Sequence, residues 1–232
     1  MRSLRFSAQM RPDGIQSCER SAMTLADHMV LIVDDDARVR EALQLLLTAS
    51  DLSAVGFESA ADYIAYPKPD VPACLILDVE LPDINGLELQ RRISQGYHPP
   101  IIFLTGHGDI PSTVRAIKAG ALDFLTKPFH AEELLKLVRS ALTQDRANRV
   151  RQADLARLRQ RVDSLTPRER EVLPLVVSGL LNKQAAAQLG ISEITLQIHR
   201  TNVMRKMAAD SLADLVRIAG ALDIPVTGSR RC

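Results

Sequence analysis

Six polar residues stand at the ends of short apolar runs, and their types are the ones that phosphate chemistry requires. Three acids, Asp34–Asp36, follow the first run, and Asp78 follows the third. Thr105 ends the fourth run and Lys127 lies just after the fifth. Carboxylates held together raise one another's pKa unless a cation lies between them. Mg²⁺ (or Mn²⁺) binds both carboxylate and phosphate oxygens, so this set indicates a metal-assisted phosphate site.

The chemistry of the set suggests a role for each member. Asp78 is a plausible nucleophile, because a carboxylate can form an aspartyl-phosphate when nearby cations offset the phosphoryl charge. Lys127 would supply a point charge and Thr105 a hydrogen-bond donor to the phosphate oxygens. Taken singly, each acid could equally be a turn or helix-cap residue, and Asp34–Asp36 could be an ordinary charge cluster before a helix. Their joint placement favours the chemical interpretation.

The elements that would position these residues alternate between two kinds of segment. The apolar runs, each short enough for one strand, are Met29–Val33, Leu52–Phe57, Ala73–Leu77, Ile101–Thr105 and Asp123–Leu125. The amphipathic stretches between and after them are 37–49, 59–66, 86–94, 110–120 and 130–143. This alternation predicts βα units with a parallel sheet buried on both faces. Carboxyl ends of parallel strands share one edge, which would gather the six residues there.

Residues 29–143 resemble the receiver domain of two-component response regulators. The matching segments are ValAspAspAsp at 33–36, LeuAspValGluLeuProAspIleAsnGlyLeuGlu at 77–88, LeuThrGlyHisGlyAsp at 104–109 and LysAlaGlyAlaLeuAspPheLeuThrLysProPhe at 118–129. The resemblance implies a doubly wound, five-stranded parallel sheet of the flavodoxin-like kind, with strand order 2-1-3-4-5. It also implies that a histidine kinase phosphorylates Asp78.

The same resemblance implies further site residues. The expected Mg²⁺ ligands are Asp34 (largely through water), Asp35, Asp78 and the backbone carbonyl of Glu80. Thr105 and Phe124 would form the switch pair, although Phe124 could also be a plain core residue. The Lys127–Pro128 bond would be cis. We expect the face built from 110–120 and 123–125 to become a homodimer contact on phosphorylation.

Charge divides the chain into an acidic and a basic part. Residues 29–142 hold 10 Lys and Arg against 16 Asp and Glu, whereas residues 143–232 hold 15 against 9. Only the second part therefore suits a polyanion, unless the charges are simply scattered over solvated faces. Residues 144–163 are rich in Arg and predict a helical linker, whose apolar positions Leu155, Leu158, Val162 and Leu165 fit a helix seam. That seam could form a short coiled coil or pack on its own domain.

The basic part predicts a domain of four helices over residues 164–224. Thr166 as N-cap, Pro167 and Glu169 mark the start of the first helix, which runs to Gly179; the others cover 182–189, 193–207 and about 212–221. On helix 193–207, a buried arc holds Leu196, Val203 and Met207, and the opposite arc holds Ile194, Gln197, Ile198, Thr201 and Arg205. The second arc suits a DNA major groove, although a small helical bundle for protein contacts would also fit.

Residues 160–222 resemble a LuxR-type helix-turn-helix domain. The resemblance rests on LeuThrProArgGluArgGluValLeu at 165–173, AsnLysGlnAlaAla at 182–186, IleSerGluIleThrLeu at 191–196 and HisArg at 199–200. It makes helix 193–207 the recognition helix. The expected DNA-contacting residues are Lys183, Thr195, Gln197, Ile198, Arg200, Thr201, Arg205 and Lys206. The family commonly has Lys where this chain has Gln197, which should bias base readout toward adenine.

Together the two resemblances place the chain near the FixJ group of regulators. The expected function is transcription control by a non-enzymatic, cytoplasmic regulator: phosphorylation on Asp78 by a histidine kinase, then dimerisation and promoter binding, with RNA polymerase as a further partner. Residues 1–28 form a polar leader and 225–232 a tail, and the start could be Met1, Met23 or Met29. Two alternatives remain, namely a haloacid-dehalogenase-like phosphatase and a receiver that acts without phosphorylation. The former places its nucleophile after the first strand, and here the candidate nucleophile follows the third.

Overall fold

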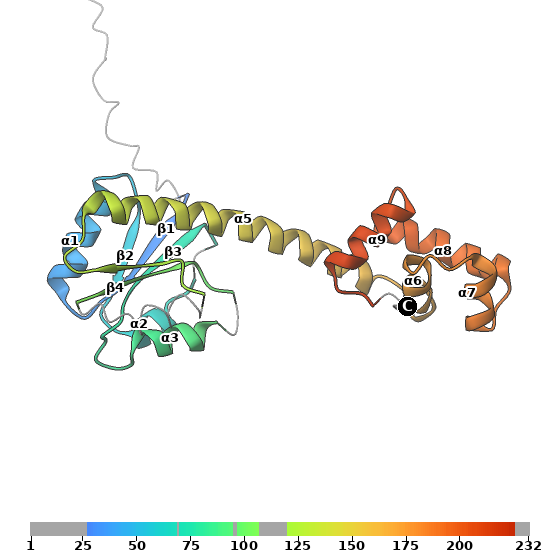
Figure 1. The fold of residues 1–232 in the computed structure, drawn as a ribbon, viewed down its shortest axis with the longest axis horizontal. Helices are drawn as coiled ribbons and strands as arrows, with labels where there is room; N and C mark the ends of the chain where they lie inside the picture. The colour runs from blue at the N-terminus through green and yellow to red at the C-terminus, as the bar shows by residue number, and fades with distance from the viewer. Residues whose placement is uncertain (1–26, 69, 95–96, 107–119, 226–232) are drawn as a thin grey trace, which may run out of the picture.

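A five-stranded parallel sheet forms the first part of the structure (Figure 1). The computed structural model describes residues 27–68, 70–94, 97–106 and 120–225. The strands are β1 Met29–Val33, β2 Ala54–Phe57, β3 Ala73–Asp78, β4 Ile101–Thr105 and β5 Asp123–Thr126. They lie in the order β2-β1-β3-β4-β5, and every neighbouring pair is parallel. The predicted sheet and its strand order are confirmed.

Alternate residues of each strand pack on opposite faces of the sheet, which explains why the runs of the central strands β1, β3 and β4 are almost entirely apolar. Helices α1 (Ala37–Thr48) and α5 (Ala131–Asp163) cover the face that carries Val30, Ile32, Ile76 and Leu104. Helices α2 (Ala60–Ala65) and α3 (Gly86–Ile93) cover the face that carries Leu31, Val33, Leu75 and Phe103. The helix predicted over 110–120 lies outside the described residues, apart from Gly120.

Side-chain caps explain where the helices begin. Asp36 caps α1 by accepting a hydrogen bond of 2.9 Å from the backbone N–H of Arg38. Asn85 caps α3 in the same way, through the N–H of Leu87 at 2.9 Å. Asp36 therefore has the helix-cap role that the sequence had left open for each of the acids. Its two neighbours, Asp34 and Asp35, remain for the candidate site.

Helix α5 is one continuous helix of 33 residues that joins the two parts of the chain (Figure 1). The sequence had predicted a helix over 130–143 and a helical linker over 144–163. Near its start, Leu134, Val138 and Ala141 pack into the sheet core, and near its end Leu158 and Val162 pack against the second core.

No helix in the described ranges is long and apolar enough to cross a membrane.

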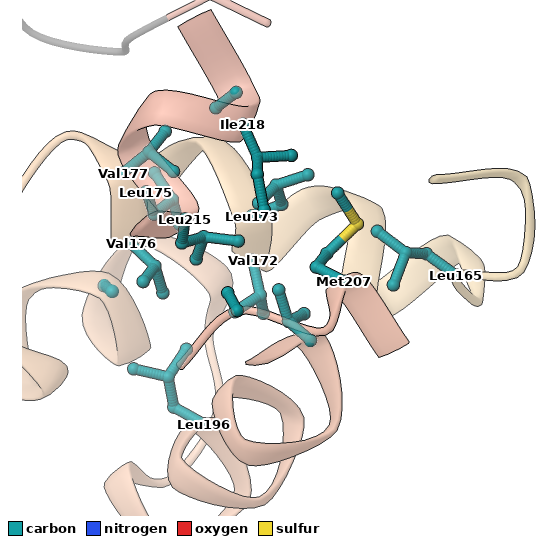
Figure 2. Packing of buried hydrophobic residues seen from close by; sticks show 14 of the residues in the cluster. Leu165, Val172, Leu173, Leu175, Val176, Val177, Leu196, Met207, Leu215 and Ile218 are labelled. Carbon is teal, nitrogen blue, oxygen red and sulfur yellow. The ribbon is translucent and has the colours of Figure 1, made fainter. Parts of the chain in front are cut away.

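Four further helices form the second part: α6 Pro167–Val177, α7 Asn182–Leu189, α8 Glu193–Met207 and α9 Leu212–Ala221. Figure 2 shows how their apolar side chains meet around Val172, Leu196, Met207 and Leu215, all of them nearly inaccessible to solvent. Thr166 begins α6 with a capping box, in which Glu169 accepts from the N–H of Thr166 at 2.8 Å. The predicted four-helix unit and its start signal are confirmed.

Glu169 leads to a prediction about the pH dependence of stability. Its carboxylate is buried and pairs with the ammonium of Lys206 at 2.7 Å. The hydrogen bond from Lys206 is the main reason why the pKa of Glu169 lies below its ordinary value of 4.5. Because the folded pKa is depressed, the stabilisation is complete above pH 4.5 and is lost as the pH falls through the folded pKa. We expect Glu169→Gln to lower the free energy of unfolding at pH 7 by about 1–3 kcal/mol.

Urea denaturation followed by circular dichroism between pH 7 and pH 3 would measure this effect. The matched control is Glu171→Gln, since Glu171 is exposed and its ion pair with Arg168 should contribute under about 1 kcal/mol. The loss in the Glu169 variant should shrink as the pH falls. Equal stability of the two variants at pH 7 would contradict the prediction.

Candidate functional site

Three carboxylates converge at the carboxyl edge of the sheet. Asp34 and Asp35 follow β1, and Asp78 ends β3; the parallel register pairs Val33 with Leu77, so both strands end at the same level. Carboxylate oxygens of the three residues lie within 4.8 Å of one another. Asp34 and Asp78 are buried, whereas Asp35 is exposed. The acids that sequence reasoning placed at one edge are therefore brought together.

Lys127, just after β5, completes the cluster. Its ammonium donates to Asp34 Oδ2 and to Asp78 Oδ2, both at 2.7 Å. Its backbone N–H donates to the carbonyl of Thr105 at 2.7 Å, and the Lys127–Pro128 bond is cis, as predicted. Lys127 thus shares one charge cluster with Asp34, 93 positions earlier in the chain, and with Asp78, 49 positions earlier.

Burial and charge act in opposite directions on this cluster. Burial raises the pKa of Asp34, and the ammonium of Lys127 counteracts that rise. Burial likewise acts to lower the pKa of Lys127, but its hydrogen bonds and charge interactions with Asp34 and Asp78 outweigh this and leave the pKa raised. The ammonium of Lys127 therefore offsets part of the cost of burying the charge of Asp34.

Backbone contacts hold Asp78 in position. Its Oδ1 accepts from the N–H of Glu80 at 3.1 Å, and the N–H of Gly86 donates to the carbonyl of Val79 at 2.9 Å. A Cβ on Gly86 would lie 2.3 Å from the carbonyl oxygen of Asp78, so only glycine lets α3 start this close to β3. The loop after the candidate nucleophile is consequently closed by main-chain packing.

Two supporting residues were not identified from the sequence. Arg40 on α1 donates to the carbonyls of Asp34 at 2.7 Å and Asp35 at 2.9 Å, and so holds the acidic loop. Asp83, in the loop after β3, accepts from the N–H of Ala61 at 3.1 Å at the start of α2. The available signal was only spacing: Arg40 lies one helical turn beyond the cap of α1, but such a position is usually solvated.

The predicted switch residues lie on neighbouring strands. Thr105 is buried at the end of β4, and Phe124 on β5 is half-buried against the core that contains Leu77 and Phe103. In the β4–β5 pairing, Phe103 lies opposite Phe124. Their action as a switch and the role of the Glu80 carbonyl stay predictions, and the predicted dimer face falls partly outside the described residues.

Helix α8 presents the second candidate site. Leu196, Val203 and Met207 face the core, as predicted. The exposed side has a hollow of about 340 Å³ lined by Ile194, Gln197, Ile198, Thr201 and Asn202. Ile194 and Ile198 are 74% and 57% exposed, which is unusual for isoleucine unless a partner covers it. The turn before α8 follows Gly190, whose φ of 66° suits glycine.

The basic residues around α8 differ in their exposure and in their hydrogen bonds to other residues of the protein. Lys183 and Arg205 are exposed, whereas Arg200 donates to the side chain of Asn182 at 2.9 Å. Lys206 donates to Glu169 at 2.7 Å and to the carbonyl of Ser164 at 3.1 Å, and Thr195 forms a hydrogen bond with Ser192 at 2.8 Å. The predicted contacts of these residues with DNA stay predictions.

An acid pocket with a lysine at the carboxyl edge of such a sheet, joined to a four-helix unit with an exposed recognition helix, defines a receiver protein with a DNA-binding output domain. The family model described as response regulator receiver domain matches residues 30–139. The model described as bacterial regulatory proteins, luxR family, matches residues 163–219. The chain belongs to the two-component response regulators with a LuxR-type helix-turn-helix, which are transcription regulators and not enzymes.

Individual relatives place the chain more narrowly, in the group of FixJ, TodT and nodulation protein W. It is 48% identical to nodulation protein W of Bradyrhizobium diazoefficiens, over 84% of this chain and 87% of that protein. It is 44% identical to the response regulator protein TodT of Pseudomonas putida, over 90% of this chain and 93% of that protein. Among solved structures, the response regulator StyR matches with a TM-score of 0.69 and 42% identity, covering 83% of this chain and 98% of StyR.

Proposed function

We propose that Asp78 is the residue that accepts the phosphoryl group in this regulator. The observation that carries the proposal is the shared ammonium of Lys127, held at 2.7 Å from both Asp34 and Asp78. A cation in that position can stay beside Asp78 and bind the oxygens of an incoming phosphoryl group. Asp35, although part of the same cluster, is exposed and has no contact of this kind with Lys127 among the described interactions.

The transfer step balances without a further reactant. A carboxylate oxygen of Asp78 forms a bond to phosphorus while the phosphorus–nitrogen bond of the kinase's phosphohistidine breaks, and the imidazole leaves with the electron pair. Lys127 holds phosphoryl oxygens by charge, and the hydroxyl of Thr105 donates to one of them. The receiver then carries a phosphoaspartate whose added charge is the signal.

The oxygen set fits a divalent cation. Asp34, Asp35 and Asp78 offer three hard carboxylate oxygens within 4.8 Å of one another, the ligand type that Mg²⁺ or Mn²⁺ prefers. We assign Asp35, Asp78 and the Glu80 carbonyl as ligands, with Asp34 acting largely through water. The ion would neutralise charge on the phosphoryl oxygens during transfer. Asp34 then keeps Lys127 oriented toward the pocket.

The output step uses the second site. Inward movement of Thr105 toward the phosphoryl group would let Phe124 turn inward, alter the neighbouring face and favour a homodimer. A dimer would place two α8 helices on two half-sites of promoter DNA, where the complex would meet RNA polymerase. In each α8, Gln197, Ile198 and Thr201 would face bases, and the basic residues, Lys183 and Arg205 foremost, would face phosphates.

Intact-mass measurement after incubation with acetyl phosphate and Mg²⁺ tests the acceptor. Wild type should gain one phosphoryl group of about 80 Da, and Asp78→Asn should gain none. Asp70→Asn is the matched control, because Asp70 is fully exposed and precedes β3 at the opposite end of the sheet. A gain in the Asp78 variant would overturn the assignment. Turnover of a phosphate ester beyond one equivalent would instead indicate a phosphatase.

A second prediction concerns base readout. The test DNA is a duplex that the wild-type protein selects from a random pool. The binding free energy of Gln197→Ala for this duplex should be weaker by about 1–3 kcal/mol, while its affinity for unselected DNA should stay the same. Arg205→Ala should weaken both kinds of binding and reduce the salt slope by about one. Arg217→Ala on α9 controls for the loss of one positive charge, since Arg217 is 82% exposed and lies outside α8. Fluorescence anisotropy across a salt series measures all three; a uniform loss in the Gln197 variant would contradict the prediction.

A further inference from the structure

Asp145 is a fully buried carboxylate that phosphorylation and DNA binding leave without a role. It lies on α5 in the same stripe as Leu134, Val138 and Ala141, which pack into the sheet core. The stripe thus changes from apolar to acidic where the helix reaches the amino-terminal edge of the sheet. That edge lies at the opposite end of the strands from the phosphoacceptor pocket.

The carboxylate accepts three hydrogen bonds. Its Oδ2 accepts from the backbone N–H of Ala73 at 2.8 Å and from Nε of Arg149 at 2.8 Å. Its Oδ1 accepts from the hydroxyl of Tyr97. The guanidinium of Arg149 also lies over the ring of Tyr97, 5.1 Å from its centroid, and contacts Asp70 at 3.4 Å. We call this group the α5 anchor; it consists of Asp145, Arg149, Tyr97 and the backbone N–H of Ala73.

The position of the Ala73 N–H explains why an acid is needed here. Leu75, two residues further along β3, donates to the carbonyl of Pro100 just before β4. The N–H of Ala73 points the same way, but β4 begins only at Ile101, so the ladder has ended before Ala73 is reached. A buried N–H without an acceptor is costly, and Asp145 replaces the missing strand.

The α5 anchor also fixes the angle of the helix about its own axis. Shifting α5 by one residue would rotate it by about 100° and take the carboxylate away from Ala73. A buried charge that loses its partners is strongly unfavourable, whereas an apolar contact tolerates small slides. The hydrogen bonds to Asp145 therefore define the rotation of α5 more sharply than the leucine and valine contacts do.

Beyond the anchor, α5 packs into neither hydrophobic core, as far as the described residues go, until it meets the output domain. Residues 150–154 are all exposed, and the next inward-facing contacts are Leu158 and Val162 against the second core. Near the carboxyl end, Arg161 donates to the carbonyl of Met207 at 3.1 Å, so this end is joined to α8. One continuous helix thus links the Asp145 contact to the recognition helix.

We propose that Asp145 is a positioning residue that holds α5, and through it the output domain, at a fixed orientation relative to the receiver sheet. Without Asp145 the helix keeps its apolar contacts, but its direction on leaving the sheet is no longer defined. Phosphorylation of Asp78 is then unaffected, while the recognition helix loses its set position. The use of this orientation in signalling rests on the proposed function; the orientation itself does not.

Pulsed dipolar EPR on the full-length protein tests the proposal. Spin labels are attached at Glu58→Cys in the receiver and Ala213→Cys in the output domain, both exposed positions. Cys18 and Cys232 are replaced by Ser, and Cys74 can stay, because it is fully buried and burial raises the pKa of its thiol. The variants compared are Asp145→Ala, Asp145→Asn and Asp154→Asn. Asp154 is the control, an exposed acid on the same helix with a surface partner, Arg157, at 3.5 Å.

We expect a clearly broader distance distribution for Asp145→Ala than for wild type, and no broadening for Asp154→Asn. Asp145→Asn keeps an acceptor for Ala73 but loses the charge opposite Arg149, so its width should be intermediate. All variants should gain one phosphoryl group from acetyl phosphate, which separates this result from a failure of the phosphoacceptor assignment. Distributions that superimpose for wild type and Asp145→Ala would overturn the proposal. If the Ala variant does not fold, an Asn variant as narrow as wild type would overturn it as well.

Discussion

Replacing Lys127 with Met is expected to lower the rate of phosphoryl uptake from acetyl phosphate by about a hundredfold while leaving the receiver folded. Within the part of the chain that the structure describes, the ammonium of Lys127 is the cationic group that contacts both buried acids, at 2.7 Å from Asp34 and Asp78. Its removal takes away the charge that stabilises phosphoryl oxygens as they approach Asp78. It also leaves two buried carboxylates beside each other without the cation that offset their charges, and their mutual repulsion is unfavourable.

The initial rate of mass gain at saturating Mg²⁺ measures this effect. Lys136→Met is the matched control, since Lys136 is an exposed lysine on α5 away from the pocket. Added Mg²⁺ should raise the melting temperature of the Lys127 variant more than that of wild type, because the ion then supplies the missing positive charge. A rate equal to that of the control would show that Lys127 has no part in the transfer.

Gly86→Ala should be the most damaging small substitution in the receiver. The added Cβ would lie 2.3 Å from the carbonyl oxygen of Asp78 and 3.2 Å from the Cα of Val79. Both neighbours are backbone atoms, one at the end of the central strand β3 and one directly after it, so neither can rotate away, and α3 must move off the sheet. That movement would disturb the packing of buried Leu89 and displace the phosphoacceptor loop. We expect a loss of about 3 kcal/mol in the free energy of unfolding, together with slower phosphoryl uptake.

Urea denaturation of wild type and of Gly86→Ala would measure the loss in the free energy of unfolding. Gly106→Ala serves as the control, because a Cβ on Gly106 would meet no atom within 4 Å. That variant should stay within about 1 kcal/mol of wild type. Similar stabilities for the two alanine variants would mean that α3 can shift without cost, contrary to the close packing seen at Asp78.

The sequence alone determined the sheet and the position of the acid pocket. Strands buried on both faces need apolar residues at nearly every position, and this requirement made the three central runs readable at Met29–Val33, Ala73–Leu77 and Ile101–Thr105. Parallel strands end at one edge, so acids after the first and third runs had to meet there. The start of the first output-domain helix could also be predicted from the sequence, because a cap such as Thr166 bonds to a residue only three positions away.

Only the tertiary structure decided which charged side chains are bound within the protein. Lys206, which stays a predicted phosphate contact, also pairs with Glu169, 37 positions earlier, and that pairing had no signal in the sequence. Asp145 and Arg149 fell within the helical linker predicted over 144–163, and only the structure shows that Asp145 is fully buried against the start of β3. Arg40 had only its spacing from the cap of α1 as a signal that it holds the acidic loop. Hydrogen bonds and ion pairs depend on distances of about 3 Å between atoms far apart in the chain, and no local periodicity encodes those distances.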